Sequence, residues 1–195
     1  MRTEVNLLTD LLPSPNKLSL GNHSHALNPD STIRANFADA NQLTFLLKNA
    51  GFSAPVQYAD AFSDYKRLTI GTTPEDTSTL EFNGPEAYSL TISSGAIQVA
   101  ARTIDGLAHG LKTLLKIITL TGKLPDLQIQ DAPDAEFRAV HLCVFNPDDG
   151  TEKENTDPDD IKRMIRLAAM SGYNHVFLEF WGMFPYRAHP YAVWP

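Results

Sequence analysis

Alternating apolar and polar residues mark most of the expected strands in the first two thirds of the chain. Residues 87–92 and 96–101 both alternate, and the short loop 93–95 between them contains glycine, so this stretch predicts a β-hairpin. Shorter apolar runs at 68–70 and 127–129 are bounded by turn-forming residues and predict two further strands.

Apolar residues at helical spacing predict two helices around these strands. The stronger pattern runs from 104 to 118, and Thr103 is placed to cap its amino terminus. Gly106 and Gly110 lie inside this helix, where each costs about 1 kcal/mol relative to alanine. That cost indicates that the helix backbone packs closely on a sheet. A second helical pattern covers 37–50.

The beginning of the chain, residues 1–36, is mostly turn-rich, although the alternation at 17–20 predicts a short edge strand. The unit closes at the proline-containing turn 131–134. Together these elements predict an α+β domain over residues 1–134, with an antiparallel sheet and helices on one of its faces.

The pattern changes after this turn. An apolar run at 137–145 is followed by an amphipathic helix that starts at Pro158 behind the capping residue Asp157, and then by a second apolar run at 173–180. Strand, helix and strand in this order form a βαβ unit with parallel strands. We therefore expect 135–195 to be the first two βα units of an incomplete (β/α)8 TIM barrel, because a whole barrel takes about 250 residues.

The composition and net charge of the chain exclude several kinds of binding partner and site. The net charge of −7 argues against nucleic acid and anionic membrane surfaces. Cys143 is the single cysteine, which excludes an internal disulfide and a cysteine-rich zinc site. No apolar run approaches the roughly 20 residues that span a bilayer. The amino terminus has no apolar signal segment, so we expect a cytoplasmic protein, or a secreted or periplasmic one if a leader has been lost.

Neither a metal nor a cofactor is expected from the residue spacing. His23 and His25 share one side of the chain but have no third ligand nearby, so a solvated loop is the favoured interpretation. The acidic loop 146–156 does not have the ligand spacing of a twelve-residue EF-hand loop.

Two groups of residues together carry a family resemblance. The first is the predicted hairpin 88–101 followed by the helix with Gly106 and Gly110; the second is Phe137-Arg138 at the start of the first expected barrel strand. They resemble the small α+β domain and the barrel opening of glycoside hydrolase family 20, the β-N-acetylhexosaminidases. The second expected barrel strand looks closest to the divergent hexosaminidase D-like branch of that family.

The resemblance implies three residues that bind substrate. Arg138 takes the place of an arginine that holds hydroxyls of the terminal N-acetylhexosamine, and a guanidinium offers a fork of donors that suits this task. A pairing of Arg138 with a carboxylate at the barrel rim is the alternative. Glu179 is a candidate for the sugar pocket or else a buried structural carboxylate, and Tyr186 is a candidate for sugar stacking or else for core packing. Ala139 and Cys143 depart from the family pattern, which commonly has glycine and aspartate there.

The activity implied is that of a retaining glycosidase that removes terminal β-linked N-acetylhexosamine, of which this chain is the amino-terminal portion. Those enzymes use an adjacent Asp-Glu pair on the fourth barrel strand. The glutamate protonates the leaving oxygen while the aspartate orients the substrate's own acetamide for attack. No Asp-Glu dipeptide occurs in this sequence, so the fragment itself is expected to be inactive.

Two alternatives stay open. The first is a non-catalytic module that binds a glycan or a protein, and the second is a glycosidase of the O-GlcNAcase or α-glucuronidase type, since those families share a similar leading domain. Under any of them, the open edge of an incomplete barrel predicts that the chain self-associates or leaves part of 136–195 disordered.

Overall fold

The computed structural model describes residues 5–37, 40–58, 65–71, 80–144, 157–180 and 187–189. The chain divides into two compact units, Met1–Asp134 and Ala135–Pro195.

Seven strands of the first unit form one sheet, in the order β1-β7-β5-β6-β4-β2-β3. The strands are β1 (Lys17–His25), β2 (Ile33–Ala35), β3 (Val56–Tyr58), β4 (Lys66–Ile70), β5 (Tyr88–Ser93), β6 (Ala96–Ala101) and β7 (Leu124–Asp131). The predicted hairpin is confirmed as β5 and β6, joined by Ser94 and Gly95 with φ angles of 52° and 78°. Two such left-handed residues are typical of the tight turns that suit the twist of a hairpin.

The prediction of a purely antiparallel sheet is wrong at one edge. Strands β2 and β3 pair in parallel, whereas the other neighbouring strands of this sheet pair antiparallel. The physical reason is the connection, because parallel strands need a crossover and a helical segment lies between β2 and β3. Each of these strands has three residues, too few for alternation to show in the sequence. The sheet is therefore mixed.

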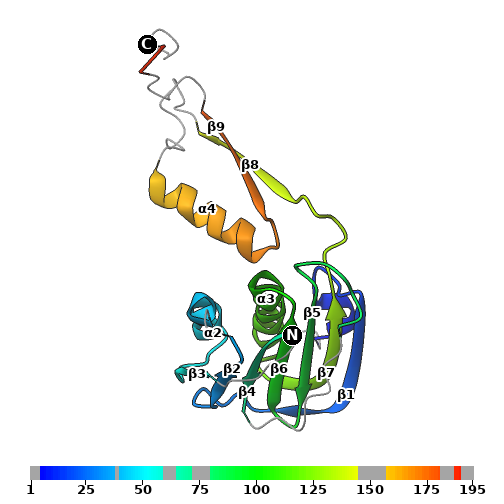
Figure 1. The fold of residues 1–195 in the computed structure, drawn as a ribbon. Coiled ribbons are helices and arrows are strands. Elements are labelled where there is room, and N and C mark those ends of the chain that lie inside the picture. The colour runs from blue at the N-terminus through cyan, green and yellow to red at the C-terminus, as the bar shows by residue number, and fades with distance from the viewer. Residues whose placement is uncertain are drawn as a thin grey trace. The chain divides into compact units, whose positions relative to one another are not determined.

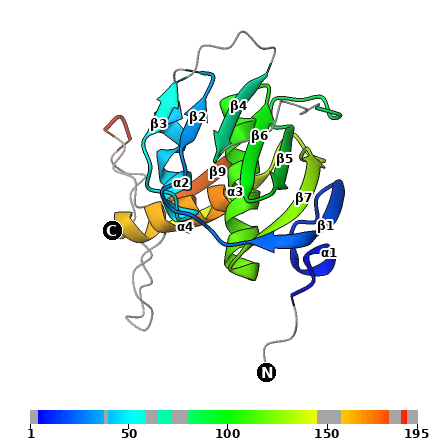
Figure 2. The ribbon, with the colours of Figure 1, turned by 90° about the horizontal axis from the view of Figure 1, so that it is seen from below.

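Helices cover one face of this sheet (Figures 1 and 2). The helical segments of the unit are α1 (Leu7–Asp10), the 3-10 helix η1 (Ala40–Leu43), α2 (Thr44–Asn49) and α3 (Ile104–Thr121). Helix α3 packs on β5 and β6, and α2 packs against α3. The predicted cap is confirmed, since the Thr103 hydroxyl accepts a hydrogen bond from the Gly106 N–H at 3.1 Å.

The two glycines of α3 let the helix approach the sheet closely. A β-carbon at Gly106 would lie 2.6 Å from the carbonyl oxygen of Ala87, and one at Gly110 would lie 2.4 Å from Cγ1 of Val99. Both distances are too short for any other residue without movement of the neighbouring atoms. This confirms that the glycines serve packing.

The sheet separates an apolar face from a polar one. Cross-strand pairs such as Leu90 with Val99 and Ile92 with Ile97 belong to the buried core beneath α3. The residues that alternate with them are mainly polar, and Gln130 donates to the Ser89 hydroxyl at 3.2 Å on that other face. The period of two along each strand thus places the large apolar side chains on the helix side, while the smaller Ser89 and Ala100 are buried on the other face.

The described residues of the second unit form a βαβ arrangement. Strand β8 (Ala139–Val144) pairs in parallel with β9 (His175–Phe180), and α4 (Pro158–Met170) connects them. Asp157 caps α4 by accepting the Asp159 N–H at 2.9 Å, as the sequence predicted. Val144 and Ala168 are buried, whereas every residue of β9 is exposed.

In the described part of the chain, no helix combines the length and apolar character that a membrane span requires.

Candidate functional site

The densest group of chemically active side chains in the described residues lies on the parallel strand pair of the second unit. His141 and Cys143 are two apart on β8, so their side chains leave the same face of the strand. Glu179 of β9 is the residue paired with Cys143 in the parallel register. The pairing of β8 and β9 therefore places an imidazole, a thiol and a carboxylate side by side.

The three groups are in mutual contact. Nε2 of His141 lies 2.8 Å from Oε2 of Glu179. The Cys143 thiol donates to the same carboxylate oxygen at 3.4 Å, and its sulfur lies 3.8 Å from Nε2 of His141. The same oxygen, Oε2 of Glu179, thus contacts both the His141 imidazole and the Cys143 thiol.

Solvent reaches this group, because the His141 and Glu179 side chains are 55% and 46% exposed. The hydrogen bond to Glu179 raises the pKa of the Cys143 thiol above its usual value, and partial desolvation and the negative charge of Glu179 act in the same direction. The thiol form of Cys143 is therefore favoured while Glu179 is ionised beside it.

Aromatic rings extend the same face of the strands toward their amino ends. The Phe137 ring lies 4.5 Å from the His175 ring and 6.0 Å from the Phe177 ring, measured between centroids. His175 and Phe177 precede Glu179 at intervals of two, so the face runs from aromatic to polar along β9.

Arg138 lies at the other end of the strand pair. Its Nε donates to the carbonyl of Gly172 at 2.7 Å, and its Nη1 donates to the carbonyl of Ala135. Its backbone N–H donates to the Asn174 side chain at 3.0 Å. These bonds hold the turn that follows α4 against the start of β8.

Arg138 and Glu179, two of the three predicted sugar-binding residues, lie far apart along the strand pair. Glu179 pairs with Cys143, five residues beyond Arg138, and at 3.3 Å per residue this is a separation of about 16 Å along the strand. Tyr186 lies outside the described residues. Of the two described residues, Glu179 is the one that lies beside the His141 imidazole and the Cys143 thiol.

The sequence pattern did not identify His141 as a member of this group, and Cys143 stood out as the single cysteine and as a departure from the family pattern, not as a site residue. Alternation along 139–144 does place both residues on one face. What the sequence did not supply is the register between β8 and β9, which decides that Glu179 lies beside them.

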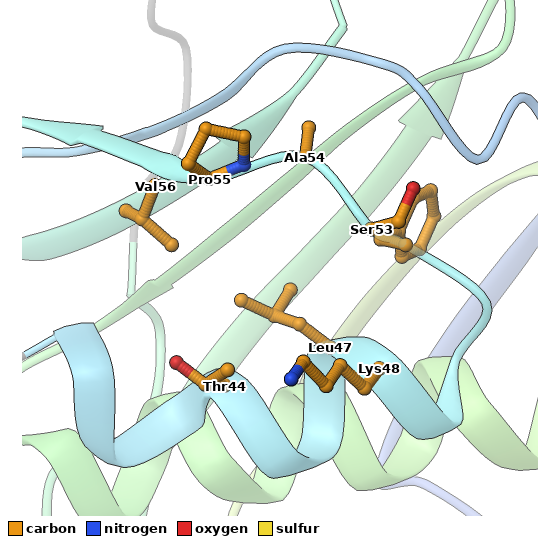
Figure 3. Close-up of a pocket in the computed structure, with 8 residues that line it drawn as sticks. Thr44, Leu47, Lys48, Ser53, Ala54, Pro55 and Val56 are labelled. Atoms are coloured by element: carbon orange, nitrogen blue, oxygen red, sulfur yellow. The ribbon is translucent and has the colours of Figure 1, made fainter.

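Two pockets of the first unit offer less chemistry. One, of about 300 Å³, lies between α2 and the segment leading into β3; Figure 3 shows Leu47 directed toward Pro55 and Val56, with Lys48 at the side. The other, of about 460 Å³, is lined mainly by loop residues such as Asp30, together with Arg34 of β2. None of the predicted site residues lines either pocket.

Comparison with known families assigns the first unit. The family model described as glycosyl hydrolase family 20, domain 2, matches residues 8–132, which is more than half of the chain. The chain therefore belongs to glycosyl hydrolase family 20, of which it carries domain 2. A search of curated proteins finds no match.

Solved structures with the same fold come from this family. The Streptomyces plicatus N-acetyl-β-hexosaminidase in complex with Thio-NAglucal is 21% identical, with a TM-score of 0.62 over 88% of this chain and 34% of that one. The Bacteroides fragilis β-N-acetylhexosaminidase is 16% identical, with a TM-score of 0.63 over 86% and 32%. The Flavobacterium johnsoniae chitobiase is 18% identical, with a TM-score of 0.59 over 90% and 28%. The chain thus spans about a third of the length of these structures.

Proposed function

We propose that this chain is the amino-terminal portion of a retaining β-N-acetylhexosaminidase-type glycoside hydrolase, which removes terminal β-linked N-acetylhexosamine. The observation that carries the proposal is the match of residues 8–132 to domain 2 of glycosyl hydrolase family 20. The relatives of known structure are named as hexosaminidases, and one of them holds the product GlcNAc.

In this proposal, the second unit supplies the first two βα units of the catalytic barrel. Two observations support the assignment. The unit has the parallel strand-helix-strand order from which such barrels are built. The matches to solved hexosaminidases also cover 86% to 91% of the chain, more than the first unit alone contains.

The roles of the chain's own residues follow from their positions. Barrel enzymes carry their chemistry at the carboxyl ends of the strands, and Glu179 is the second-last residue of β9. Its carboxylate accepts hydrogen bonds from sugar hydroxyls, while the His141 contact holds its orientation. The family resemblance assigns Tyr186 to the same sugar and Arg138 to hydroxyls of the substrate. Arg138 directly precedes β8, about 16 Å from Glu179 along the strand, and its guanidinium donates to two backbone carbonyl groups, so the geometry favours Glu179 over Arg138 as the sugar ligand.

The bond-breaking step requires groups that this sequence lacks. In the proposed mechanism, an adjacent Asp-Glu pair lets the substrate's acetamide attack the anomeric carbon while the glutamate protonates the leaving oxygen. The sequence contains no Asp-Glu dipeptide, so the 195-residue chain by itself releases no sugar.

The test compares the 195-residue chain with the complete product of its gene on nitrophenyl β-N-acetylglucosaminide. We expect nitrophenol release by the complete product and none by the chain alone. Activity toward an α-linked glucuronide instead would assign the related α-glucuronidase type. Glycan binding without hydrolysis of either compound would favour the non-catalytic module.

A substitution in the complete product tests the role of Glu179. Glu179→Gln removes the charge but keeps the shape, and the loss of a charge-assisted hydrogen bond of about 1.5–3 kcal/mol predicts a 10- to 150-fold lower kcat/KM. Glu81→Gln, on a half-exposed carboxylate of the first unit, is the matched control and should leave kcat/KM unchanged. An unchanged kcat/KM in Glu179→Gln would remove Glu179 from the sugar site.

A further inference from the structure

We propose that His141, Cys143 and Glu179 form a binding site for a divalent metal ion of the zinc class. The inference rests on side-chain chemistry and geometry within the second unit and not on the proposed glycosidase activity, with which it shares Glu179 and His141. Its ligand atoms are Nε2 of His141, Sγ of Cys143 and a carboxylate oxygen of Glu179, and all three lie within 4.8 Å of one another.

The kinds of ligand select the kind of metal. A thiolate and an imidazole are soft or intermediate donors that suit Zn²⁺ and Co²⁺, whereas Ca²⁺ and Mg²⁺ prefer sites built from oxygen atoms. Zinc sites that keep a fourth position open usually have three protein ligands, which is the number found here. The set therefore indicates a zinc-type site accessible to solvent.

The distances fit tetrahedral coordination closely at two of the three edges. Metal-ligand bonds of 2.0–2.3 Å at tetrahedral angles separate neighbouring ligand atoms by about 3.4–3.6 Å. The sulfur-oxygen and sulfur-nitrogen distances are 3.4 Å and 3.8 Å. The nitrogen-oxygen distance is 2.8 Å, which is about 0.6 Å short of this geometry. A small rotation of the exposed Glu179 carboxylate lengthens it.

The backbone already fixes the ligands in place. His141 and Cys143 lie on one strand at the spacing that gives a common face, and Glu179 is held opposite Cys143 by the parallel register. Little chain ordering is then needed for an ion to bind. The exposure of the His141 and Glu179 side chains gives the ion a route from solvent.

Metal binding replaces the hydrogen bonds now present within the group. The Cys143 thiol gives up its proton to solvent and its sulfur binds the metal as a thiolate. The His141 ring binds through Nε2 as a neutral imidazole that carries its one proton on Nδ1, so its contact with Glu179 is replaced by two metal-ligand bonds. No oxidation state changes in this exchange, so the ion is the one additional reactant.

The experiment titrates Co²⁺ into the 195-residue chain after treatment with a chelator. Because Cys143 is the single cysteine, a cobalt-thiolate charge-transfer band can come only from this residue. We expect that band together with the strong visible bands of tetrahedral cobalt, saturating at one ion per chain and abolished by added Zn²⁺. A chain that shows no thiolate band at stoichiometric Co²⁺ would overturn the proposal without any variant.

Substitutions then test the other two ligands. His141→Asn and Glu179→Gln should each weaken Co²⁺ binding at least about tenfold, the loss that even supporting contacts of a metal site cause. His25→Gln is the matched control, because His25 forms a similar imidazole-carboxylate pair with Asp126 at 2.9 Å in the first unit, and it should leave binding unchanged. Circular dichroism of each variant checks that the fold is retained.

Two outcomes would contradict the site even if the band appears. Full-strength binding in both His141→Asn and Glu179→Gln would show that Cys143 binds cobalt without them, as in a bridge between two chains. Saturation at one ion per two chains would show the same bridge directly.

Discussion

The hydroxyl of Tyr88 is buried where β5, β7 and α3 of the first unit meet. The hydroxyl lies 2.7 Å from Oγ1 of Thr113 on α3 and donates to Oδ2 of Asp131 at 3.0 Å at the end of β7. Tyr88 is 3% exposed, and burial together with the Asp131 charge raises its pKa far above the usual value. Asp131 also accepts the Asn16 N–H at 3.0 Å, so one carboxylate joins β5, β7 and the start of β1.

Removing this hydroxyl is expected to destabilise the first unit. Tyr88→Phe breaks a buried hydrogen bond to a charged group, which predicts a loss of about 1.5–3 kcal/mol in the free energy of unfolding. Urea denaturation followed by circular dichroism measures the loss. Tyr58→Phe, at a position 52% exposed, is the control and should change the free energy by less than about 0.5 kcal/mol.

The raised pKa of Tyr88 also sets the direction of a pH effect. Above about pH 10, the unfolded chain loses the tyrosine proton while the folded chain keeps it. The unfolded state then binds fewer protons, so this residue's contribution is complete below pH 10 and declines as the pH rises further. The free energy of unfolding should therefore fall less steeply in Tyr88→Phe than in the parent chain between about pH 9 and pH 11, the range around the usual tyrosine pKa. Equal slopes in the two chains would contradict this explanation.

At the scale of elements, α3 packs closely on the sheet because its glycines have no β-carbon. Gly110→Ala gains about 1 kcal/mol in helix propensity, yet the new β-carbon meets Cγ1 of Val99 at 2.4 Å. Overpacking of this kind costs about 1–3 kcal/mol, so we expect a net loss of free energy of unfolding of up to about 2 kcal/mol.

A double substitution separates the two effects in Gly110→Ala. Val99→Ala removes the methyl group that the new β-carbon would meet, so Gly110→Ala should be far less destabilising in the Val99→Ala background. Chemical denaturation of all four chains gives the coupling energy. A coupling energy near zero would show that the close approach of α3 to β6 is not what requires glycine.

The elements that could be predicted are those whose pattern is long or has a clear signal at its ends. Helix α3 begins at Ile104 behind Thr103 as expected, and the hairpin of β5 and β6 follows from alternation and a glycine turn. Strands β2 and β3 were not predicted because they have three residues each, too few to show alternation. Strand β1 extends through Gly21 to His25, so the loop predicted around His23 is wrong. The segment is polar and gives no strand pattern in the sequence, but β1 is held as a strand by its pairing with β7.

The candidate site was less predictable than the fold for a related reason. Alternation shows which residues share a face of one strand, but it does not give the register between two strands separated by a long connection. Glu179 was identified by family resemblance, whereas its contacts with His141 and Cys143 depend on tertiary pairing alone.

At the scale of the whole chain, the described core is concentrated in the first unit. Of the buried apolar residues in the described part of the chain, only Val144 and Ala168 belong to the second unit. That unit instead exposes large apolar side chains, including Phe137, Leu167 and Phe177. Exposed apolar surface of this kind favours association.

We therefore predict that the 195-residue chain self-associates through its second unit. Sedimentation velocity should show a mass that rises with concentration, whereas residues 1–134 alone should remain monomeric. Phe177→Lys, at a position 56% exposed, should shift the chain toward monomer because it places a charge on that apolar surface. A monomer at all concentrations of the parent chain would contradict the prediction.

The solitary thiol on β8 makes the chain ready for site-specific labelling. A maleimide dye or spin label added to the unaltered protein reacts at Cys143 alone, without prior removal of competing cysteines. The probe would then lie beside Glu179, on the strand face where a sugar is proposed to bind. Because the label consumes the Cys143 thiol, it also removes the sulfur ligand of the proposed metal site. Changes in its emission or mobility would report which molecules reach that face of the 195-residue chain.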